Sequence, residues 1–273
     1  MAGSILGTAV RRVEDPELLR GRGTFVDNIA RGRTDALHAV FVRSPFPHAE
    51  ITAIDTSEAA SSPGVVGVFT AEDLGEKPVP TFAQANDAVH RYALAGGRVR
   101  YVGDPVALVV AETRAQAVDA VELVDVDYQP LPAVVDPEAA AEPGAPEVHE
   151  ELACNIAIRR LGEGDPLDDA ELVVRARFEN NRLATAPIEA NAILADPTPD
   201  DAGHRLTVWV SSQHPHLGQR LFSRFTGLDK AEIRVVAPHV GGAFGGKPGV
   251  SPDHAAVVGA ALALGRPVGW TET

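Results

Sequence analysis

The sequence has little cysteine and no long apolar runs, and each shortage excludes a class of site. Cys154 is the only cysteine among 273 residues, so an internal disulfide, a zinc knuckle and a cysteine-ligated iron–sulfur cluster are excluded within this chain. Cys154 lies between Ala153 and Asn155, and we expect its thiol to be inert. No apolar run approaches the ~20 residues of a membrane-spanning helix. A reducing, cytoplasmic location is expected.

Positive charge is also scarce. The chain has 24 Lys and Arg against 38 Asp and Glu, a net charge of −14. This excess of carboxylates argues against a nucleic-acid-binding surface and against docking on an anionic membrane. Arg11 and Arg12 are followed by the acidic residues 13–17, without an apolar core, so we reject a twin-arginine export signal.

The first half of the chain alternates strands with short helices. Residues 3–34 are rich in Gly and Arg, and we expect an extended arm with short turns. Strands are predicted at 37–43 and 64–69, and residues 106–128 predict strand, helix, strand. Such mixing favours an α+β layer.

The second half differs in composition. Residues 133–150 repeat Ala, Glu and Pro and form the best candidate for a linker. Four further strands are predicted in the region beyond it, at 172–178, 192–194, 205–210 and 233–236. Helices are expected over 216–225 and from Pro252 to Leu264, with Ser251 as N-cap.

A glycine loop is the most informative motif. Residues 241–247 read Gly-Gly-Ala-Phe-Gly-Gly-Lys between a predicted strand and a predicted helix. Glycines permit positive φ and let backbone N–H groups approach an anion. The spacing resembles a phosphate-binding P-loop, but Pro248 stands where that motif needs Ser or Thr. A tight turn without a ligand is the structural alternative.

Polar residues follow the strand that contains Trp209. Gln213 is a neutral donor and acceptor at a strand end, where ligand sites gather in α/β layers. His214 and His216 have the wrong spacing for one helical face, and we favour helix-start or solvated rings over metal ligands. Glu189 lies among apolar residues, so it either pairs with an arginine or faces a site.

Several segments together resemble the molybdenum-binding large subunit of the xanthine dehydrogenase and aldehyde oxidase family, in its carbon-monoxide-dehydrogenase-like branch. The segments are residues 7–27 (GTAVRRVEDPELLRGRGTFVD), 38–51 (HAVFVRSPFPHAEI), 63–74 (PGVVGVFTAEDL), 101–120 (YVGDPVALVVAETRAQAVDA), 208–216 (VWVSSQHPH) and 240–247 (VGGAFGGK). The resemblance implies an α+β fold in which an α/β hammerhead domain precedes an incomplete molybdopterin-binding domain. The expected parts are an N-terminal arm (1–20), the hammerhead domain (21–132), a linker (133–160) and the truncated cofactor domain (161–273).

The resemblance also implies a function. The family carries out oxidative hydroxylation of aldehydes or N-heterocycles, or oxidation of CO, with water as the oxygen source. The chain would bind part of a molybdenum–molybdopterin dinucleotide through Gln213 and through four residues of the glycine loop: Gly242, Ala243, Phe244 and Gly245. The catalytic Glu would lie outside this chain. Expected partners are a remaining molybdopterin-binding polypeptide, an FAD-binding medium subunit and a 2Fe-2S small subunit.

Three departures and one alternative accompany the resemblance. Ala243 replaces a usual glycine, residues 189–191 follow the family pattern loosely, and Pro248 replaces the substrate-facing Glu of purine-oxidising members, which disfavours xanthine. The family continues far beyond Thr273, so we expect the chain to be inactive alone, as a split subunit or a truncated product. The alternative is a non-catalytic assembly or scaffold remnant that never holds cofactor.

Overall fold

The computed structural model describes residues 6–7, 9–75, 77–81, 86, 88–159, 164, 167 and 169–273. Its helices are α1 (Asp15–Leu18), α2 (Val26–Arg31), α3 (Ser57–Ser61), α4 (Ala71–Leu74), α5 (Arg114–Val121), α6 (Pro137–Ala141), α7 (Pro215–Thr226) and α8 (Pro252–Leu264), with 3-10 turns η1 (Glu150–Leu152) and η2 (Lys230–Glu232). Its strands are β1 (Leu37–Arg43), β2 (Ala49–Asp55), β3 (Val65–Phe69), β4 (Arg98–Val99), β5 (Pro105–Ala111), β6 (Asp125–Pro130), β7 (Ala192–Asp196), β8 (Leu206–Val210), β9 (Ile233–Val236) and β10 (Val268–Thr271).

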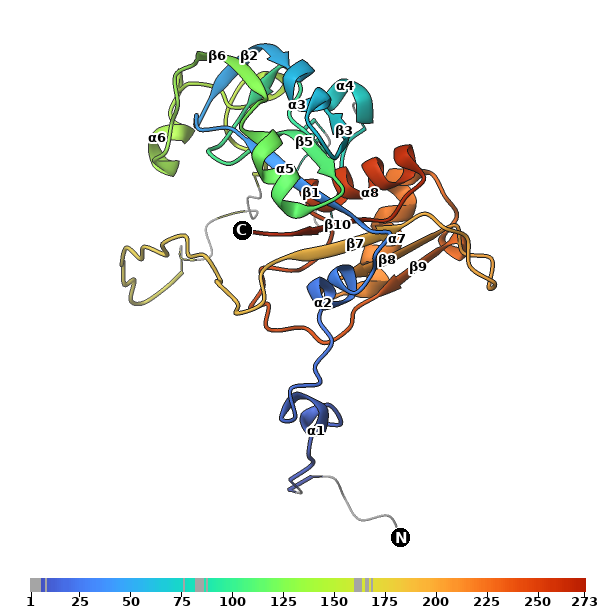
Figure 1. Cartoon of the computed structure of the whole chain (residues 1–273). Coiled ribbons are helices and arrows are strands. Elements are labelled where there is room, and N and C mark those ends of the chain that lie inside the picture. Colours follow the sequence, from blue (N-terminus) through green and yellow to red (C-terminus); the bar gives the residue numbers. More distant parts are fainter. Residues whose placement is uncertain are drawn as a thin grey trace.

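One large sheet joins strands from both halves of the chain. Its order is β3-β5-β1-β10-β7-β8-β9, and a second sheet has the order β4-β2-β6. The two halves meet where β1 runs parallel to β10, with Leu37 opposite Val268. β8 and β9 are also parallel, and the other neighbours in the large sheet are antiparallel. The mixed α+β fold expected from the sequence is confirmed (Figure 1).

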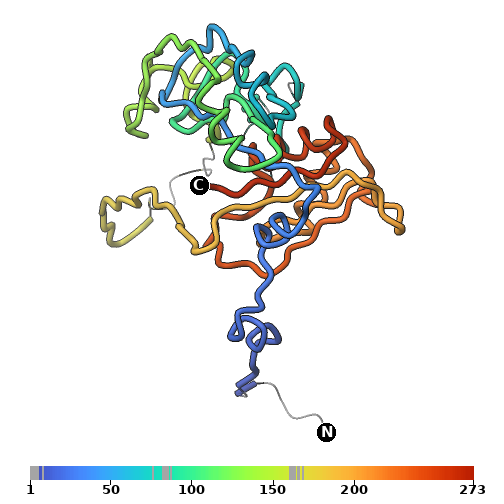
Figure 2. The backbone as a smooth tube through the Cα atoms, viewed as in Figure 1, coloured from blue at the N-terminus to red at the C-terminus, as the bar shows by residue number. Residues whose placement is uncertain are grey.

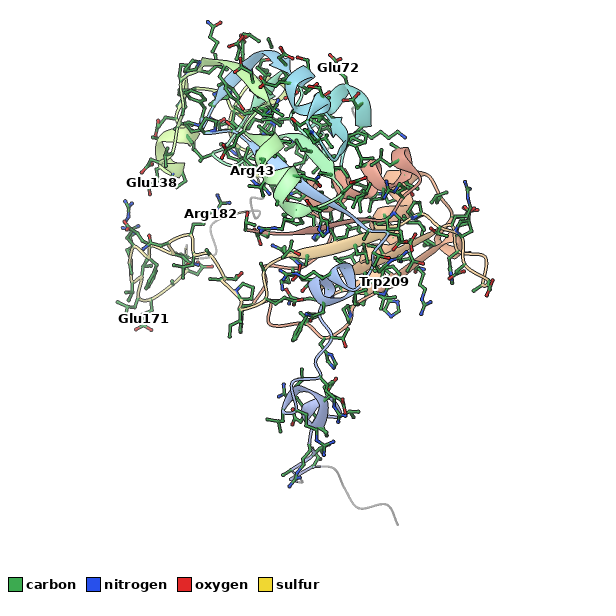
Figure 3. All side chains as sticks on the ribbon, viewed as in Figure 1. Arg43, Glu72, Glu138, Glu171, Arg182 and Trp209 are labelled. Atoms are coloured by element: carbon green, nitrogen blue, oxygen red, sulfur yellow. The ribbon has the colours of Figure 1, made fainter. Side chains whose placement is uncertain are left out.

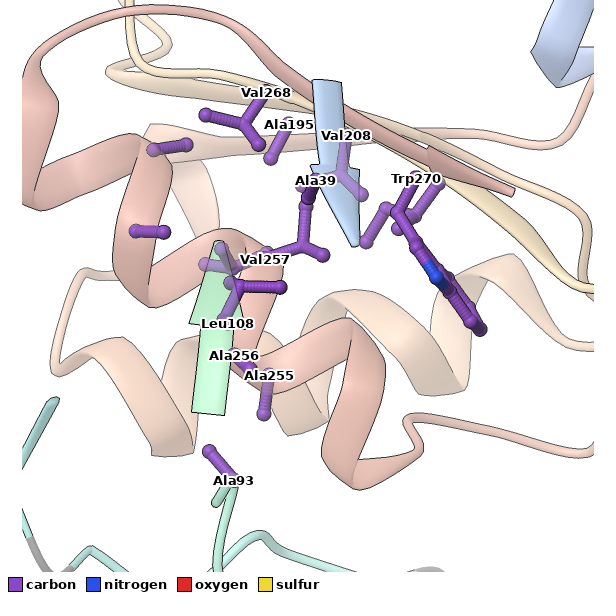
Figure 4. Packing of buried hydrophobic residues seen from close by; sticks show 14 of the residues in the cluster. Ala39, Ala93, Leu108, Ala195, Val208, Ala255, Ala256, Val257, Val268 and Trp270 are labelled. Carbon is purple, nitrogen blue, oxygen red and sulfur yellow. The ribbon is translucent and has the colours of Figure 1, made fainter. Parts of the chain in front are cut away.

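Helices cover both faces of the large sheet because its central strands are apolar on both sides. In β5, Leu108 and Val110 face the core that contains α7 and α8, whereas Ala107, Val109 and Ala111 face α5. Figure 4 shows the first core, in which small residues of α8 lie close to the strands. On the opposite face, α2 packs against β7. Among the described helices, none has the length and apolarity to cross a bilayer.

The N-terminal region departs from its prediction. The sequence predicts an extended arm over residues 3–34, but α1 and α2 form within it. Val26 and Ala30, four residues apart, are buried against the sheet, because this spacing gives a short helix one apolar face. The described residues that precede α2 project away from the body of the molecule (Figure 2).

The strand predicted at 172–178 is wrong. Residues 172–190 have no helix or strand assignment, and Leu172 and Phe178 are 80% and 90% exposed. The apolar alternation is present, but a strand also needs a neighbour to accept its backbone hydrogen bonds, and none of the described strands pairs with this segment. In Figure 3 the segment forms a loop between the labelled Glu171 and Arg182 that stands away from the sheet.

Candidate functional site

The glycine loop leaves β9 and leads into α8, as its sequence position predicts. Gly242 and Gly245 have φ of +99° and +90°, and Phe244 between them has φ of +51°. The first two values lie in a region that favours glycine. Phe244 is 77% exposed, so its ring stands in solvent at the tip of the loop rather than in the core.

Close packing fixes the two ends of the loop. A Cβ on Gly241 would lie 2.5 Å from Cβ of Glu189, and one on Gly246 would lie 2.4 Å from Oγ1 of Thr185. Both distances are shorter than van der Waals contact allows. Glycine is therefore required at these ends by space, whereas at Gly245, where a Cβ would meet nothing within 4 Å, it is required by φ.

The backbone N–H groups of residues 242–245 make no hydrogen bond to the described residues. The flanking N–H groups are engaged: Gly241 donates to Glu189 Oε2 (2.7 Å) and Gly246 donates to the carbonyl of Ala243 (2.8 Å). Opposite the N–H groups of residues 242–245, no hydrogen-bond acceptor is found in the described part of the chain. A run of free N–H groups in a glycine loop is the arrangement that binds anions.

Gln213 lies beside this loop, because two hydrogen bonds tie it to Lys247. Its backbone N–H donates to the carbonyl of Lys247 (3.0 Å), and its side-chain Oε1 accepts from the N–H of Lys247 (3.3 Å). This bond fixes the orientation of the side-chain amide. The two hydrogen atoms on Nε2 can then be donated to another acceptor. The five residues expected to contact the cofactor are therefore brought to one end of β8 and β9.

A buried lysine lies under the loop. The side chain of Lys247 is 1% exposed, and its Nζ donates to Ser211 Oγ (2.7 Å) and to the carbonyl of Glu189 (2.8 Å). Nζ also forms an ion pair with Glu189 Oε2 at 3.2 Å. Ser211 in turn donates to the same carboxylate oxygen at 2.6 Å. A buried ammonium requires such partners, and here they join β8, the loop and residue 189.

The structure decides between the two roles predicted for Glu189. The carboxylate is 13% exposed and pairs with a lysine, not with the arginine considered from the sequence. Through Oε2 it also accepts the N–H of Gly241, so it holds the start of the glycine loop. Its other oxygen, Oε1, is buried without a partner in the described structure. Sequence reasoning missed Lys247 and Ser211 as members of this cluster, and only their charge and polarity beside apolar neighbours could have indicated it.

Two predicted histidines lie at the start of α7. His214 is the N-cap residue but its side chain makes no capping hydrogen bond, and His216 follows in the first turn. Both rings are exposed, which agrees with the solvated-ring interpretation. Where the chain is described, no group of three or more His, Cys, Asp or Glu side chains has a metal-binding arrangement.

A large open cavity adjoins the loop on the side of the N-terminal arm. It measures about 710 Å³ and is lined by Arg12, Phe25, His239 and Gly241, among others. His239 anchors the arm, because its Nδ1 accepts from the N–H of Thr24 (2.8 Å) and its own N–H donates to the carbonyl of Thr24 (3.1 Å). The arm thus forms one wall of a hollow that ends at the glycine loop.

His254 is the titratable group most affected by burial near the loop. It lies in the first turn of α8 and its ring is 6.1 Å from that of Trp270. Burial lowers the pKa of His254, although Asp253 and Glu272 act in the opposite direction. The imidazole is therefore neutral in the folded protein near neutral pH, and it adds no positive charge behind the loop.

Two known protein families match most of the chain. Residues 20–132 match the a/b hammerhead domain of aldehyde oxidase and xanthine dehydrogenase, and residues 148–273 match the molybdopterin cofactor-binding domain. The second match contains Gln213, the glycine loop and the Lys247–Glu189–Ser211 cluster.

Similar proteins include two large subunits and one solved structure of oxidising enzymes. The chain is 40% identical to the nicotine 6-hydroxylase large subunit of Paenarthrobacter nicotinovorans, over 98% of this chain and 33% of the relative. It is 37% identical to the carbon monoxide dehydrogenase large chain of Afipia carboxidovorans, over 98% of this chain and 34% of that one. The crystal structure of quinoline 2-oxidoreductase from Pseudomonas putida 86 superposes with a TM-score of 0.87 and 34% identity, over 98% of this chain and 34% of that one.

The chain spans about a third of the length of the relatives it matches. Within that third, the two family matches together span residues 20–132 and 148–273. The chain belongs to the xanthine dehydrogenase and aldehyde oxidase family, in which it matches the molybdenum-binding large subunits.

Proposed function

We propose that this chain supplies part of the cofactor site of a molybdenum hydroxylase. The substrate class is an aldehyde, an N-heterocycle or CO, and water supplies the oxygen atom. The observation that carries the proposal is the run of free N–H groups at residues 242–245 beside the Nε2 donor of Gln213. The relatives whose names specify nicotine and quinoline favour N-heterocycles as the first substrates to test.

The donor set fits an anionic, oxo-bearing group. The free N–H groups carry partial positive charge without a formal cation, and Nε2 of Gln213 can donate to an oxo oxygen without adding charge. Gly245 and Gly242 keep the loop free of Cβ atoms where the group would approach. When bound, the molybdenum cofactor would supply a metal that can accept two electrons from the substrate. The residues of this chain bind that group, orient it and donate hydrogen bonds to it.

The finer features of the proposal come from the family resemblance. We propose a dinucleotide form of the pterin, bound only in part by this chain, with the remainder held by a further molybdopterin-binding polypeptide. An FAD-binding medium subunit and a 2Fe-2S small subunit would carry the electrons away. The proposed divisions of the chain are the arm (1–20), the hammerhead domain (21–132), the linker (133–160) and the cofactor domain (161–273).

A second candidate is an assembly component without cofactor. It is favoured by the exposed apolar side chains of residues 172–183, where Leu172, Val174, Phe178 and Leu183 are at least 80% exposed. Exposed apolar patches mark contacts with other polypeptides. Such a role would use this surface and leave the glycine loop without a ligand.

One purification distinguishes the two candidates. The tagged chain is isolated from its native cell, copurifying polypeptides are identified by mass spectrometry, and molybdenum is measured in the same eluate. A hydroxylase subunit should carry stoichiometric molybdenum with flavin and iron–sulfur partners, and Gln213→Ala should lower activity of that complex. Partners without molybdenum, and an unchanged complex with Gln213→Ala, would favour the assembly role.

A further inference from the structure

A second pocket lies on the hammerhead side of the molecule. It measures about 240 Å³ and is bounded by residues 89–95 before β4, residues 100–104 after it, Val148–His149 and Pro252 at the start of α8. Neither the glycine loop nor Gln213 contributes to it. The pocket is therefore distinct from the proposed cofactor site.

Two arginines without carboxylate partners line this pocket. Nε of Arg100 donates to the carbonyl of Val148 (3.2 Å), which fixes the guanidinium against the wall. Among the described residues, no Asp or Glu forms an ion pair with Arg91 or Arg100. Arg98, between them in sequence, pairs with both Glu50 and Glu150. In a chain of net charge −14, two unpaired guanidiniums in one concavity point to an anionic ligand.

The two arginines outnumber the one carboxylate that lines the pocket, Asp104. Oδ2 of Asp104 accepts the N–H of Arg100 (3.0 Å). Burial raises the pKa of Asp104, whereas hydrogen bonds from Arg100 and Tyr101 and the charge of Arg100 lower it. The neighbouring Asp253 raises it further and is itself paired with Arg43 at 2.6 Å. Burial, followed by Arg100, lowers the pKa of His149, so this ring is neutral near neutral pH.

Aromatic rings form the remaining walls. The rings of His90 and Tyr92 lie 6.3 Å apart at 57°, and Tyr101 contributes a third ring. Flat faces beside guanidinium groups suit a planar ligand, because a ring can stack there while its charged group meets the arginines. The volume is below the range of drug-sized pockets, which limits the ligand to about one ring.

We propose that this pocket binds a small aromatic carboxylate, with the carboxylate on Arg91 and Arg100 and the ring among Tyr92, Tyr101 and His90. The proposal does not depend on the cofactor site. An arginine–carboxylate contact gives the affinity, and the ring walls select aromatic over aliphatic acids.

Titration of the purified chain with benzoate tests the proposal. Binding is measured by calorimetry, and amide shifts in heteronuclear NMR spectra locate it. Benzoate should bind with shifts at residues 89–104 and 148–149. Benzamide, which has the same shape without the charge, and acetate, which lacks the ring, should each bind at least about tenfold more weakly.

Arginine variants make the test specific. Arg91→Gln should weaken benzoate at least about tenfold, since a charged hydrogen bond is lost, and Arg91→Lys should restore part of the affinity. Arg224→Gln, at the exposed end of α7, is the matched control and should bind as the wild type does. Absence of benzoate binding at millimolar concentration, or equal affinity in Arg91→Gln and the wild type, would overturn the proposal.

Discussion

Lys247→Met measures how much the buried cluster beneath the glycine loop contributes to the free energy of unfolding. Methionine keeps the unbranched stem and most of the volume but removes the ammonium that serves Ser211 and Glu189. The carboxylate of Glu189 then stays buried with only neutral donors. Breaking a buried pair by removing one partner costs 3–5 kcal/mol, and the 13% exposure of Glu189 places our expectation near the lower limit, about 3 kcal/mol.

The assay is urea unfolding followed by tryptophan fluorescence, since Trp270 packs in the core against Phe41. Glu189→Gln is measured beside Lys247→Met, and the double variant completes a cycle. The double variant should be more stable than the sum of the single losses predicts, by about 2 kcal/mol, because each single variant strands the other charge. Lys230→Met, at an exposed lysine of η2, is the matched control and should change stability by less than about 0.5 kcal/mol.

Two results would contradict a stabilising role for the cluster. A loss below about 1 kcal/mol in Lys247→Met would mean that the cluster contributes little to stability. Strictly additive losses in the double variant would mean that the lysine and the carboxylate do not interact, whatever their distance.

Three further predictions concern other contacts. Arg33→Ala should cost about 1–3 kcal/mol in urea unfolding, because it strands Asp196, which lies at the end of β7 and accepts from Arg33 at 2.5 Å. The pKa of His254 is lowered in the folded protein, so the unfolded chain binds the proton first as the pH falls. Below pH ~6.5 the free energy of unfolding of the wild type should therefore fall by up to about 1.4 kcal/mol per pH unit because of His254. His254→Leu should remove this contribution to the pH dependence of stability. Gly241→Ala should destabilise the loop, because its Cβ would lie 2.5 Å from Cβ of Glu189, and proteolysis near the loop should accelerate.

Each of these predictions has a control. Arg22→Ala breaks the exposed pair with Glu17 and should change stability by less than about 0.5 kcal/mol. A slope that persists unchanged in His254→Leu would contradict the titration argument. Gly203→Ala is the control for Gly241→Ala. Gly203 lies in a turn after β7 at a positive φ, and a Cβ there meets nothing within 4 Å, so this variant shows the effect of backbone strain without a clash.

The sequence predicts a helix or strand correctly where its local pattern agrees with the burial and hydrogen bonding that the fold gives it. β5 is a run of apolar residues between turn signals, and it is buried along its whole length. α8 begins at Pro252 after Ser251, whose side chain accepts the N–H of His254 (3.2 Å). At such places the sequence predicts both the type of element and the residue where it begins.

Long-range contacts were not predictable in the same way. The sequence offers no local sign that Lys247 reaches Glu189, 58 residues earlier, because that contact depends on β7, β8 and β9 lying side by side in the sheet. The alternating residues 172–178 look like a strand, yet pairing requires a neighbour that pattern alone does not supply. The sequence of α2 predicts an extended arm rather than a helix, because its single apolar face covers fewer than two turns.

The pterin content of the purified complex shows whether the glycine loop binds the cofactor. Wild type and Gly245→Val are isolated from the native cell, and pterin is oxidised to its fluorescent form and measured per chain. Gly245 has φ of +90° and no neighbour to clash with, so valine should distort the loop and leave the core intact. We expect stoichiometric pterin in the wild type and loss of most of it in Gly245→Val, with partners retained. Equal pterin in both proteins would contradict the assignment of the glycine loop as the cofactor site.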